Sequence, residues 1–244
     1  MAVDFHIVIP ARYASARLPG KPLRLIHHKP MIQWVYEAAA GSDAKQVIVA
    51  TDDERISSCV RGFGAKVCMT SERHQTGSDR LVEVAQKFSW DDDTIVVNLQ
   101  GDEPLMPASN MTQVAQNLQS SDCDMATLHK IIDTERAQNA NQVKLVHDYQ
   151  GRVLYFSRSP IPFDREQKHI DYCGHIGIYA YRVGFLNTFT RLEICEIEAD
   201  EKLEQLRALW HGYSIHTELA AEPPGPGVDT EDDLLQVIRL IDQS

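Results

Sequence analysis

The sequence lacks the two motifs by which most nucleotide-binding loops are recognised. It contains no G-x-x-x-x-G-K-[ST] motif, because Gly20-Lys21 is followed by Pro22 and no earlier glycine stands in the loop. A G-x-G-x-x-G motif is absent as well. A P-loop and an ordinary dinucleotide-binding loop are therefore disfavoured. Any phosphate would be held mostly by cationic side chains rather than by a glycine-rich backbone.

Long apolar runs and paired cysteines are also missing. No run approaches the length of a membrane span, and Asp4 and Pro10 interrupt the pattern of a signal peptide. The cysteines show neither C-x-x-C nor zinc-site spacing, and they are Cys59, Cys68, Cys123, Cys173 and Cys195. We expect reduced thiols, a cytoplasmic location and no membrane partner.

Acidic residues are absent from one stretch of an otherwise acidic chain. The net charge is −11, yet no Asp or Glu lies between Asp4 and Glu37. The basic residues of that stretch are Arg12, Arg17, Lys21, Arg24 and Lys29. Charge alone fits a solvated basic loop equally well. The loop, however, follows Ile7-Val8-Ile9, a run typical of a buried strand. This position favours binding of a polyanion such as a triphosphate. The negative overall charge argues against nucleic acid as a partner.

The first hundred residues alternate between predicted strands and helices. With 43% hydrophobic and 24% charged residues, the 244-residue chain fits one large α/β domain, or a core with a smaller lobe. After the strand at 7–9, the predicted elements are a helix at 30–40, a strand at 46–51, a helix at 53–63, a strand at 66–70, a helix ending at 87 and a strand at 94–100. This order predicts right-handed βαβ units and a parallel sheet.

From about Cys123 the predicted strands follow one another more closely. They cover residues 125–129, 143–146, 152–157 and 175–182. A helix is expected over residues 200–211, and Thr230 with Asp233 resembles a capping box that opens a C-terminal helix. The change predicts a mixed or antiparallel lobe inserted in the core fold.

Two aspartates at loop junctions are candidate ligands of Mg²⁺. Asp102 follows the strand at 94–100 and precedes Pro104, and Asp229 stands just before the C-terminal helix. Beside a cationic phosphate loop such carboxylates suit Mg²⁺, which binds one or two protein carboxylates together with substrate phosphate oxygens. The alternatives are a turn aspartate that bonds its own backbone at 102 and a helix cap at 229, and local sequence favours the cap for Asp229.

The predicted lobe carries side chains suited to a polyhydroxylated acid. Along the strand at 175–182, a period of two places His175 and Tyr179 on one face. Arg158 directly precedes the stiff segment Ser159-Pro160-Ile161-Pro162 and suits a carboxylate ligand. Further candidates, beside the apolar face of the helix at 200–211, are Glu204 and Gln205. The alternatives are an ordinary half-exposed strand at 175–182, which the residues alone favour, and plain solvent contact for Glu204 and Gln205.

Eight motifs occur in an order that matches one enzyme family. They are IPARYASARLPGKP, ATDD, HQTGSDR, NLQGDEP, YFSRSPIPFDR, HIGIYAYR, KLEQLRALWHG and PGVDT, from residue 9 to residue 230. On these motifs the chain closely resembles the 3-deoxy-manno-octulosonate (Kdo) cytidylyltransferases, or CMP-Kdo synthetases, over essentially its whole length. The resemblance implies a nucleotide-diphospho-sugar transferase-like α/β fold, with a mostly parallel, Rossmann-like sheet and a smaller mixed lobe used for homodimerisation. It also implies that CTP and Kdo react to give CMP-Kdo and diphosphate for lipopolysaccharide synthesis.

The same resemblance implies a role for each site residue. Arg12, Arg17 and Lys21 would hold the triphosphate, with Arg17 and Lys21 stabilising the departing diphosphate, and Asp102 and Asp229 would hold Mg²⁺ at the nucleotide. The cytidine would be framed by Pro10, Ala11, Gly77, Arg80 and Gln100. The sugar acid would be bound by Arg158, His175, Tyr179, Glu204 and Gln205.

The chain departs from the family pattern mainly in the lobe, which is expected at about residues 123–207, between core segments at about 1–122 and 208–244. The family usually has an arginine where Gly174 stands, and the loop at 165–173 is short.

In-line attack of the sugar's anomeric hydroxyl on the α-phosphorus needs positioning and charge neutralisation, and no Ser-His-Asp or Cys-His set predicts a covalent intermediate. The alternatives are a cytidylyltransferase for another 2-keto sugar acid (sialic-acid-like or amino-Kdo), a glycosyltransferase on a similar core, and a nucleotide-sensing or scaffold domain without turnover.

Overall fold

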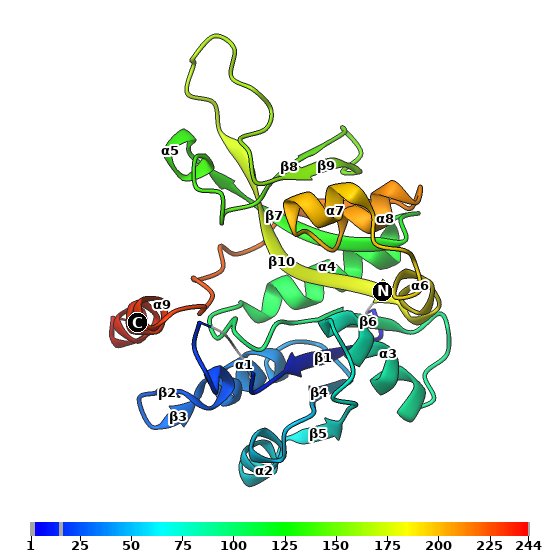
Figure 1. The fold of residues 1–244 in the computed structure, drawn as a ribbon, viewed down its shortest axis with the longest axis vertical. Helices are drawn as coiled ribbons and strands as arrows, with labels where there is room; N and C mark the ends of the chain where they lie inside the picture. The colour runs from blue at the N-terminus through cyan, green and yellow to red at the C-terminus, as the bar shows by residue number, and fades with distance from the viewer. Residues whose placement is uncertain (1–2, 15–16, 244) are drawn as a thin grey trace.

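A nine-stranded sheet runs through the computed structural model, which describes residues 3–14 and 17–243 (Figure 1). Its strands are β1 (Phe5–Ala11), β4 (Gln46–Thr51), β5 (Lys66–Met69), β6 (Ile95–Asn98), β7 (Met125–Ile132), β8 (Lys144–His147), β9 (Val153–Ser157), β10 (Tyr172–Arg182) and β11 (Ile215–Leu219). The main path runs β11-β7-β10-β6-β1-β4-β5, while β8 pairs with β10 and β9 pairs with β8. The pairs β11–β7, β6–β1, β1–β4 and β4–β5 are parallel, so the central sheet is mostly parallel, as predicted.

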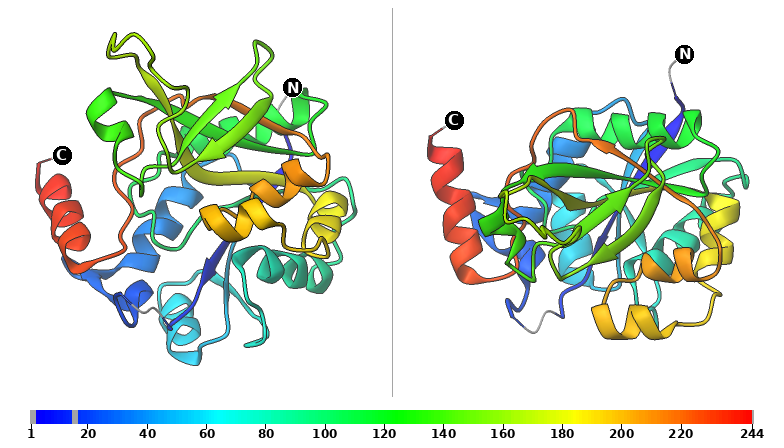
Figure 2. Two further views of the ribbon diagram at one scale, coloured as in Figure 1. Left: turned by 45° about the horizontal axis from the view of Figure 1, so that its top comes forward. Right: turned by 90° about the horizontal axis from the view of Figure 1, so that it is seen from above.

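Helices cover both faces of this sheet, and a short ribbon lies outside it (Figure 2). The helices are α1 (Met31–Ala40), α2 (Glu54–Gly62), α3 (Gly77–Lys87), α4 (Ala108–Ser120), α5 (Thr134–Ala137), α6 (Val183–Phe189), α7 (Glu196–Glu201), α8 (Leu206–Trp210) and α9 (Glu231–Asp242). The remaining elements are the 3₁₀ helix η1 (Lys21–Leu23) and the ribbon strands β2 (Leu25–Ile26) and β3 (Lys29–Pro30).

The apolar run of β1 is explained by burial on both of its faces. Ile7 and Ile9 pack into a cluster with side chains of α1, α2 and α4, whereas Val8 packs into a second cluster with side chains of α3, α6 and α8. Successive side chains of a strand point to opposite faces, so a strand between two helical layers has to be apolar throughout. A third cluster joins α9 to the β2 region through Ile26, Leu234 and neighbouring residues.

Most predicted elements are confirmed, and one helix is wrong. The strand and helix predictions up to residue 100 match β1, α1, β4, α2, β5, α3 and β6 to within a few residues, and β10 pairs antiparallel with β6, β7 and β8, as expected of a mixed lobe. The single helix predicted over 200–211 is instead α7 and α8, because Lys202 adopts a left-handed conformation (φ 54°) that ends α7. The division into a core and a lobe stays a prediction, and strands from both parts share one sheet.

The cysteines lie apart from one another, and all five are free. Burial raises the pKa of the thiols of Cys59, Cys68 and Cys173, so these side chains are protonated at neutral pH. Within residues 3–14 and 17–243, no helix has both the length and the apolar character needed to cross a membrane.

Candidate active site

The carboxyl end of β1 forms the floor of the candidate site. β1 pairs with β4 on one side and with β6 on the other, and ligands of open α/β sheets bind at such a switch point. The loop after β6 returns to this end at Gly101. A side chain there would lie 2.9 Å from the carbonyl oxygen of Pro10, so glycine lets the two backbones touch. The close approach brings Asp102 to the edge of the sheet.

Lys21 lies between two carboxylates. Its Nζ is 2.5 Å from Oδ2 of Asp102 and 3.1 Å from Oδ1 of Asp229. Burial alone would lower the pKa of Lys21, but the two carboxylates outweigh it and raise the pKa, so the ammonium group is charged at neutral pH. Among the described residues, the Asp102 carboxylate bonds Lys21 and no backbone N–H, which contradicts the simple turn alternative.

Asp229 reaches the same point from a segment that is remote in sequence. The N–H of Val228 donates to the carbonyl oxygen of Asp102 at 2.8 Å and ties the two loops together. The side chain of Asp229 pairs with Lys21 and, at 3.0 Å, with Nη2 of Arg17.

The helix-cap alternative for Asp229 is therefore wrong. The N-cap of α9 is Thr230, whose hydroxyl accepts from the N–H of Asp233, and the carboxylate of Asp233 accepts in turn from the N–H of Thr230. This is the predicted capping box, and it leaves the Asp229 carboxylate available to face the cationic loop.

The predicted phosphate residues surround a cavity of about 660 Å³, which we call the phosphate cavity. Arg12, Arg17 and Lys21 line it together with Asp102 and Asp229. Arg12 is exposed and forms no ion pair with a described residue, so its guanidinium is available to an anionic ligand. The cavity thus combines three cations with two carboxylates, the composition expected around a metal-bound polyphosphate.

The predicted cytidine residues border a smaller cavity of about 140 Å³, the base cavity. Those that it brings together are Pro10, Ala11, Gly77, Arg80 and Gln100, together with Arg12. The Arg80 guanidinium is buried and fixed by hydrogen bonds to Asp52 Oδ2 (2.5 Å) and Thr70 Oγ1 (2.8 Å). The residues shared with the phosphate cavity are Pro10, Ala11, Arg12 and Gln100.

A third cavity, also about 660 Å³, lies on the other side of the two aspartates, and we call it the sugar cavity. It shares Arg17, Asp102 and Asp229 with the phosphate cavity and is lined further by Arg158 and His175. The Arg158 guanidinium donates to the carbonyl oxygens of Glu201 (Nε, 2.6 Å) and Ala140 (Nη1, 3.0 Å), and forms no ion pair with a described carboxylate. A fixed cation without a counter-ion suits an acidic ligand.

His175 is held neutral at the wall of the sugar cavity. Its Nε2 lies 2.8 Å from the Tyr179 hydroxyl and 3.2 Å from Oγ1 of Thr127. Burial lowers the pKa of His175 to about 3, so the imidazole carries no charge at neutral pH. The predicted alternation is confirmed, because Tyr179 packs with the α3–α6–α8 side of the sheet while Ile176 and Ile178 pack on the other.

The other three predicted sugar residues border none of these cavities. The Tyr179 hydroxyl is hydrogen-bonded to Nε2 of His175. Oε2 of Glu204 accepts a hydrogen bond from Oγ of Ser78 at 3.1 Å. Oε1 of Glu204 and Nε2 of Gln205 are buried without a hydrogen-bond partner among the described residues. Buried polar atoms of this kind call for a partner such as a water molecule or a ligand, and the sugar contacts of these residues stay a prediction.

Sequence reasoning missed two lysines and one carboxylate. Lys130, near the end of β7, lines the sugar cavity, as does Glu103. Burial and the charge of Asp102 raise the pKa of Glu103 to about 8, so its carboxyl group is protonated at neutral pH. Lys144 is fully buried and donates to the carbonyl oxygens of Gln142 and Arg158. A lysine inside an apolar strand was the available signal for Lys144.

Gly174 departs from the family pattern for a packing reason. A Cβ at this position would lie 2.9 Å from Cγ2 of Ile132 and 3.2 Å from Nε2 of Gln142. A side chain there would crowd those of Ile132 and Gln142, so the glycine fits the local packing of β10, and its effect on the sugar site stays a prediction.

Comparison with known proteins agrees with this geometry. A family model described as Cytidylyltransferase matches residues 6–215. Proteins named 3-deoxy-manno-octulosonate cytidylyltransferase are 52% identical in Vibrio vulnificus, over 98% of both chains, and 51% identical in Tolumonas auensis, over 98% of this chain and 97% of the relative. A solved CMP:2-keto-3-deoxy-manno-octonic acid synthetase complexed with CTP has a TM-score of 0.93 at 44% identity, over 98% of this chain and 99% of that one. The chain belongs to the 3-deoxy-manno-octulosonate cytidylyltransferase family.

Proposed function

We propose that this protein transfers the cytidylyl group of CTP to Kdo and releases diphosphate. The observation that carries the proposal is the row of three cavities, in which the phosphate cavity shares residues with both of its neighbours. A nucleotide with its base in the base cavity would present its α-phosphorus beside the sugar cavity. The names of the relatives and the CTP-bound solved structure support cytidine as the base and Kdo as the acceptor.

In the proposed reaction the anomeric oxygen of Kdo forms a bond to the α-phosphorus while the bond to the departing diphosphate breaks. Negative charge builds on the diphosphate, and Lys21, Arg17 and Arg12 are the cations around it. Lys21 is more enclosed than Arg17, since its side chain is only 13% exposed against 62% for Arg17. Its charge is therefore the least screened by water and should contribute most.

The sugar carboxylate would be bound by the two cations of the sugar cavity. Arg158 is positioned by backbone carbonyl groups, and Lys130 has no ion-pair partner within 4 Å among the described residues. His175, kept neutral by burial and hydrogen-bonded to Tyr179, can exchange a hydrogen bond with a sugar hydroxyl through its other ring nitrogen. This division of roles supports an acidic, polyhydroxylated acceptor.

We propose Mg²⁺ as the cofactor, held by Asp102 and Asp229. Both carboxylates approach one point, where the Lys21 ammonium now balances their charge, and both are partly exposed, which leaves room for the water and phosphate ligands that Mg²⁺ retains. When bound, the ion would neutralise phosphate charge and orient the triphosphate. Lys21 would then turn from the aspartates toward the phosphate oxygens.

We further propose a homodimer that works in the cytoplasm, with its product used for lipopolysaccharide. Large apolar side chains are exposed around the β8–β9 hairpin and the loop after it, at Tyr149, Leu154 and Phe163. We place the dimer contact at this segment, because exposed apolar surface commonly marks a protein–protein contact. Free cysteines fit a reducing compartment. A Leu154→Glu variant should shift the mass measured by light scattering from dimer to monomer, and an unchanged mass would place the contact elsewhere.

The test of the activity is a diphosphate-release assay that crosses the four ribonucleoside triphosphates with Kdo, sialic-acid-like and amino-substituted 2-keto sugar acids. CTP with Kdo should give the highest kcat/KM, with CMP-Kdo as the product identified by mass spectrometry. Turnover with another sugar acid and not with Kdo would make the protein a cytidylyltransferase for that other acid. Transfer from a preformed CMP-sugar, with release of CMP and no diphosphate, would indicate a glycosyltransferase, and binding without turnover would indicate a sensing domain.

A further inference from the structure

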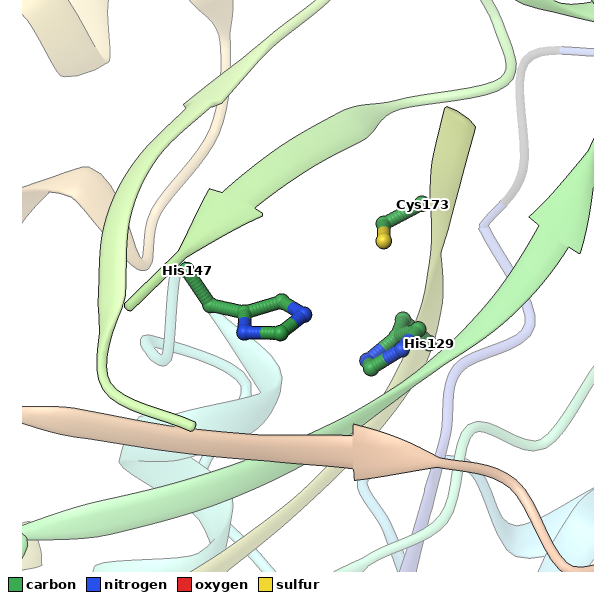
Figure 3. A group of neighbouring side chains, drawn as sticks. All are labelled: His129, His147 and Cys173. Atoms are coloured by element: carbon green, nitrogen blue, oxygen red, sulfur yellow. The ribbon is translucent and has the colours of Figure 1, made fainter. Parts of the chain in front are cut away.

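Strands in the upper part of Figure 1 surround a polar cluster, drawn in Figure 3, whose residues border none of the three cavities. The pairings run β11–β7, β7–β10, β10–β8 and β8–β9, and a bridge between Arg152 and His216 returns to β11. The strands therefore form a small closed ring. The side chains of His129, His147 and Cys173 point toward one another within it, from β7, β8 and β10.

The register explains why these three side chains share one side of the strands. Cys173 lies opposite Ile131 of β7 and opposite Leu145 of β8. His129 and His147 are each two residues from those partners, and a separation of two keeps a side chain on the same face. The register irregularity between Val146 and His147 leaves the extra residue, Leu154, on β9, so the alternation along β8 continues to His147.

The spacing of the donor atoms is close to that of a metal site. One nitrogen of each imidazole and the Sγ of Cys173 all lie within 4.8 Å of one another. In tetrahedral zinc sites, with bonds of about 2.0–2.3 Å, the ligand atoms are about 3.3–3.8 Å apart. The difference is within reach of side-chain rotation, because His147 is exposed and Cys173 is only partly buried.

Hydrogen bonds already select the ring nitrogens that would bind. Nδ1 of His147 lies 2.7 Å from the carbonyl oxygen of Asp148, and since a carbonyl only accepts, this nitrogen carries the proton. Nδ1 of His129 lies 3.0 Å from Oγ1 of the buried Thr217. Neither Nε2 has a hydrogen-bond partner among the described residues. Metal-ligating histidines are oriented in this way, with one nitrogen held by an oxygen and the other facing the ion.

We propose that His129, His147 and Cys173 bind one Zn²⁺ ion, with water at the fourth position. Two imidazoles and a thiolate are the donors of a borderline-soft ion and are unsuited to Mg²⁺, which separates this site from Asp102 and Asp229. The thiol proton of Cys173 is released to solvent on binding. The ion would tie β7, β8 and β10 together, next to the residues of β7 and β10 that border the sugar cavity, Lys130 and His175.

The test is a titration of tag-free, metal-free protein with Co²⁺ followed by absorption spectroscopy. One equivalent should produce a thiolate-to-cobalt charge-transfer band in the near ultraviolet and strong tetrahedral d–d bands, both displaced by Zn²⁺. Cys173→Ser should abolish the charge-transfer band. His147→Gln should weaken metal affinity at least ~10-fold, as loss of a ligand or its support commonly does. Zn²⁺ should also raise the melting temperature of the wild type, and at the same Zn²⁺ concentration it should raise that of each variant by less.

Matched controls separate this site from other cysteines, histidines and carboxylates. Cys59→Ser and His28→Gln change residues outside the cluster, and Asp102→Asn changes the proposed Mg²⁺ site, so all three should keep the full band. Wild-type protein without a charge-transfer band, or a band that survives Cys173→Ser, would overturn the proposal. If Cys173→Ser does not fold, His147→Gln decides, because an exposed side chain at a strand end is replaced there with little cost to packing.

Discussion

Replacing Lys21 by methionine removes the most enclosed of the three cations that line the phosphate cavity. The ammonium lies 2.5 Å and 3.1 Å from two carboxylates, and its side chain is 13% exposed, so its charge acts where water screens it little. Loss of one group that stabilises charge in the transition state commonly lowers kcat by about 10²–10³-fold, or about 2.7–4 kcal/mol. We expect Lys21→Met to fall in this range, with the KM for Kdo nearly unchanged, because the lost interaction strengthens as the diphosphate departs.

The assay is continuous diphosphate release at saturating CTP, Kdo and Mg²⁺, with KM measured for each substrate. Arg24→Met is the matched control: it removes a cation of the same loop, but Arg24 pairs with Glu231 at the surface and borders none of the three cavities. This control should stay within about 2-fold of the wild type, as exposed ion pairs contribute little. A Lys21→Met enzyme with normal kcat and a raised KM for Kdo alone would refute the role in diphosphate departure.

Three further predictions concern the sugar cavity, the metal and acid stability. Arg158→Ala should raise the KM for Kdo at least ~30-fold, since a buried carboxylate without its partner costs about 2–5 kcal/mol. This rise in KM should be larger than the rise caused by Tyr179→Phe. Loss of CTP binding in calorimetry would instead assign Arg158 to the nucleotide. Asp102→Asn and Asp229→Asn should each lower kcat at least ~10²-fold with an unchanged circular dichroism spectrum, and normal turnover in both would remove the Mg²⁺ assignment. Although burial opposes it, hydrogen bonds from Lys87, Ser71 and His74 lower the pKa of Glu83 from 4.5 to about 2. Glu83→Gln should therefore destabilise the fold by about 2–3 kcal/mol at pH 7, and urea unfolding should show this difference shrinking from pH 4.5 toward pH 2; a constant difference would contradict the shift.

The nucleotide half of the molecule follows closely from its sequence. A β-branched run predicts β1, the acid-free loop predicts the cations beside it, and Asp102 is found because it follows another apolar strand. These signals are local, since the strand end and its ligand residue are a few positions apart. The apolar spacing of Met111, Val114 and Leu118 also predicts α4, so that helix was available to pattern analysis and was not named.

The sugar half depends on contacts that no local pattern carries. Lys130 borders its cavity because β7 pairs with β10, and Lys144 is buried because three carbonyl groups from two loops surround its ammonium. The break at Lys202 is another such case, since the residue has an ordinary helix propensity and ends α7 through its left-handed backbone. The capping reading of Asp229 failed for the same reason: its partners, Lys21 and Arg17, belong to a distant part of the chain.

The hydrogen bond between Val228 and Asp102 joins a loop made early in synthesis to one made late. Chains begin to fold from the N-terminus as they leave the ribosome. The parallel strands β1, β4, β5 and β6 can therefore associate while the second carboxylate does not yet exist, with Lys21 facing Asp102 alone. A nascent chain in that condition has its cationic loop but lacks half of the counter-charge. Assembly of the site thus has to await the synthesis of residue 229, and a chain cut before it would retain all the strands of the sheet while lacking the second carboxylate of the site.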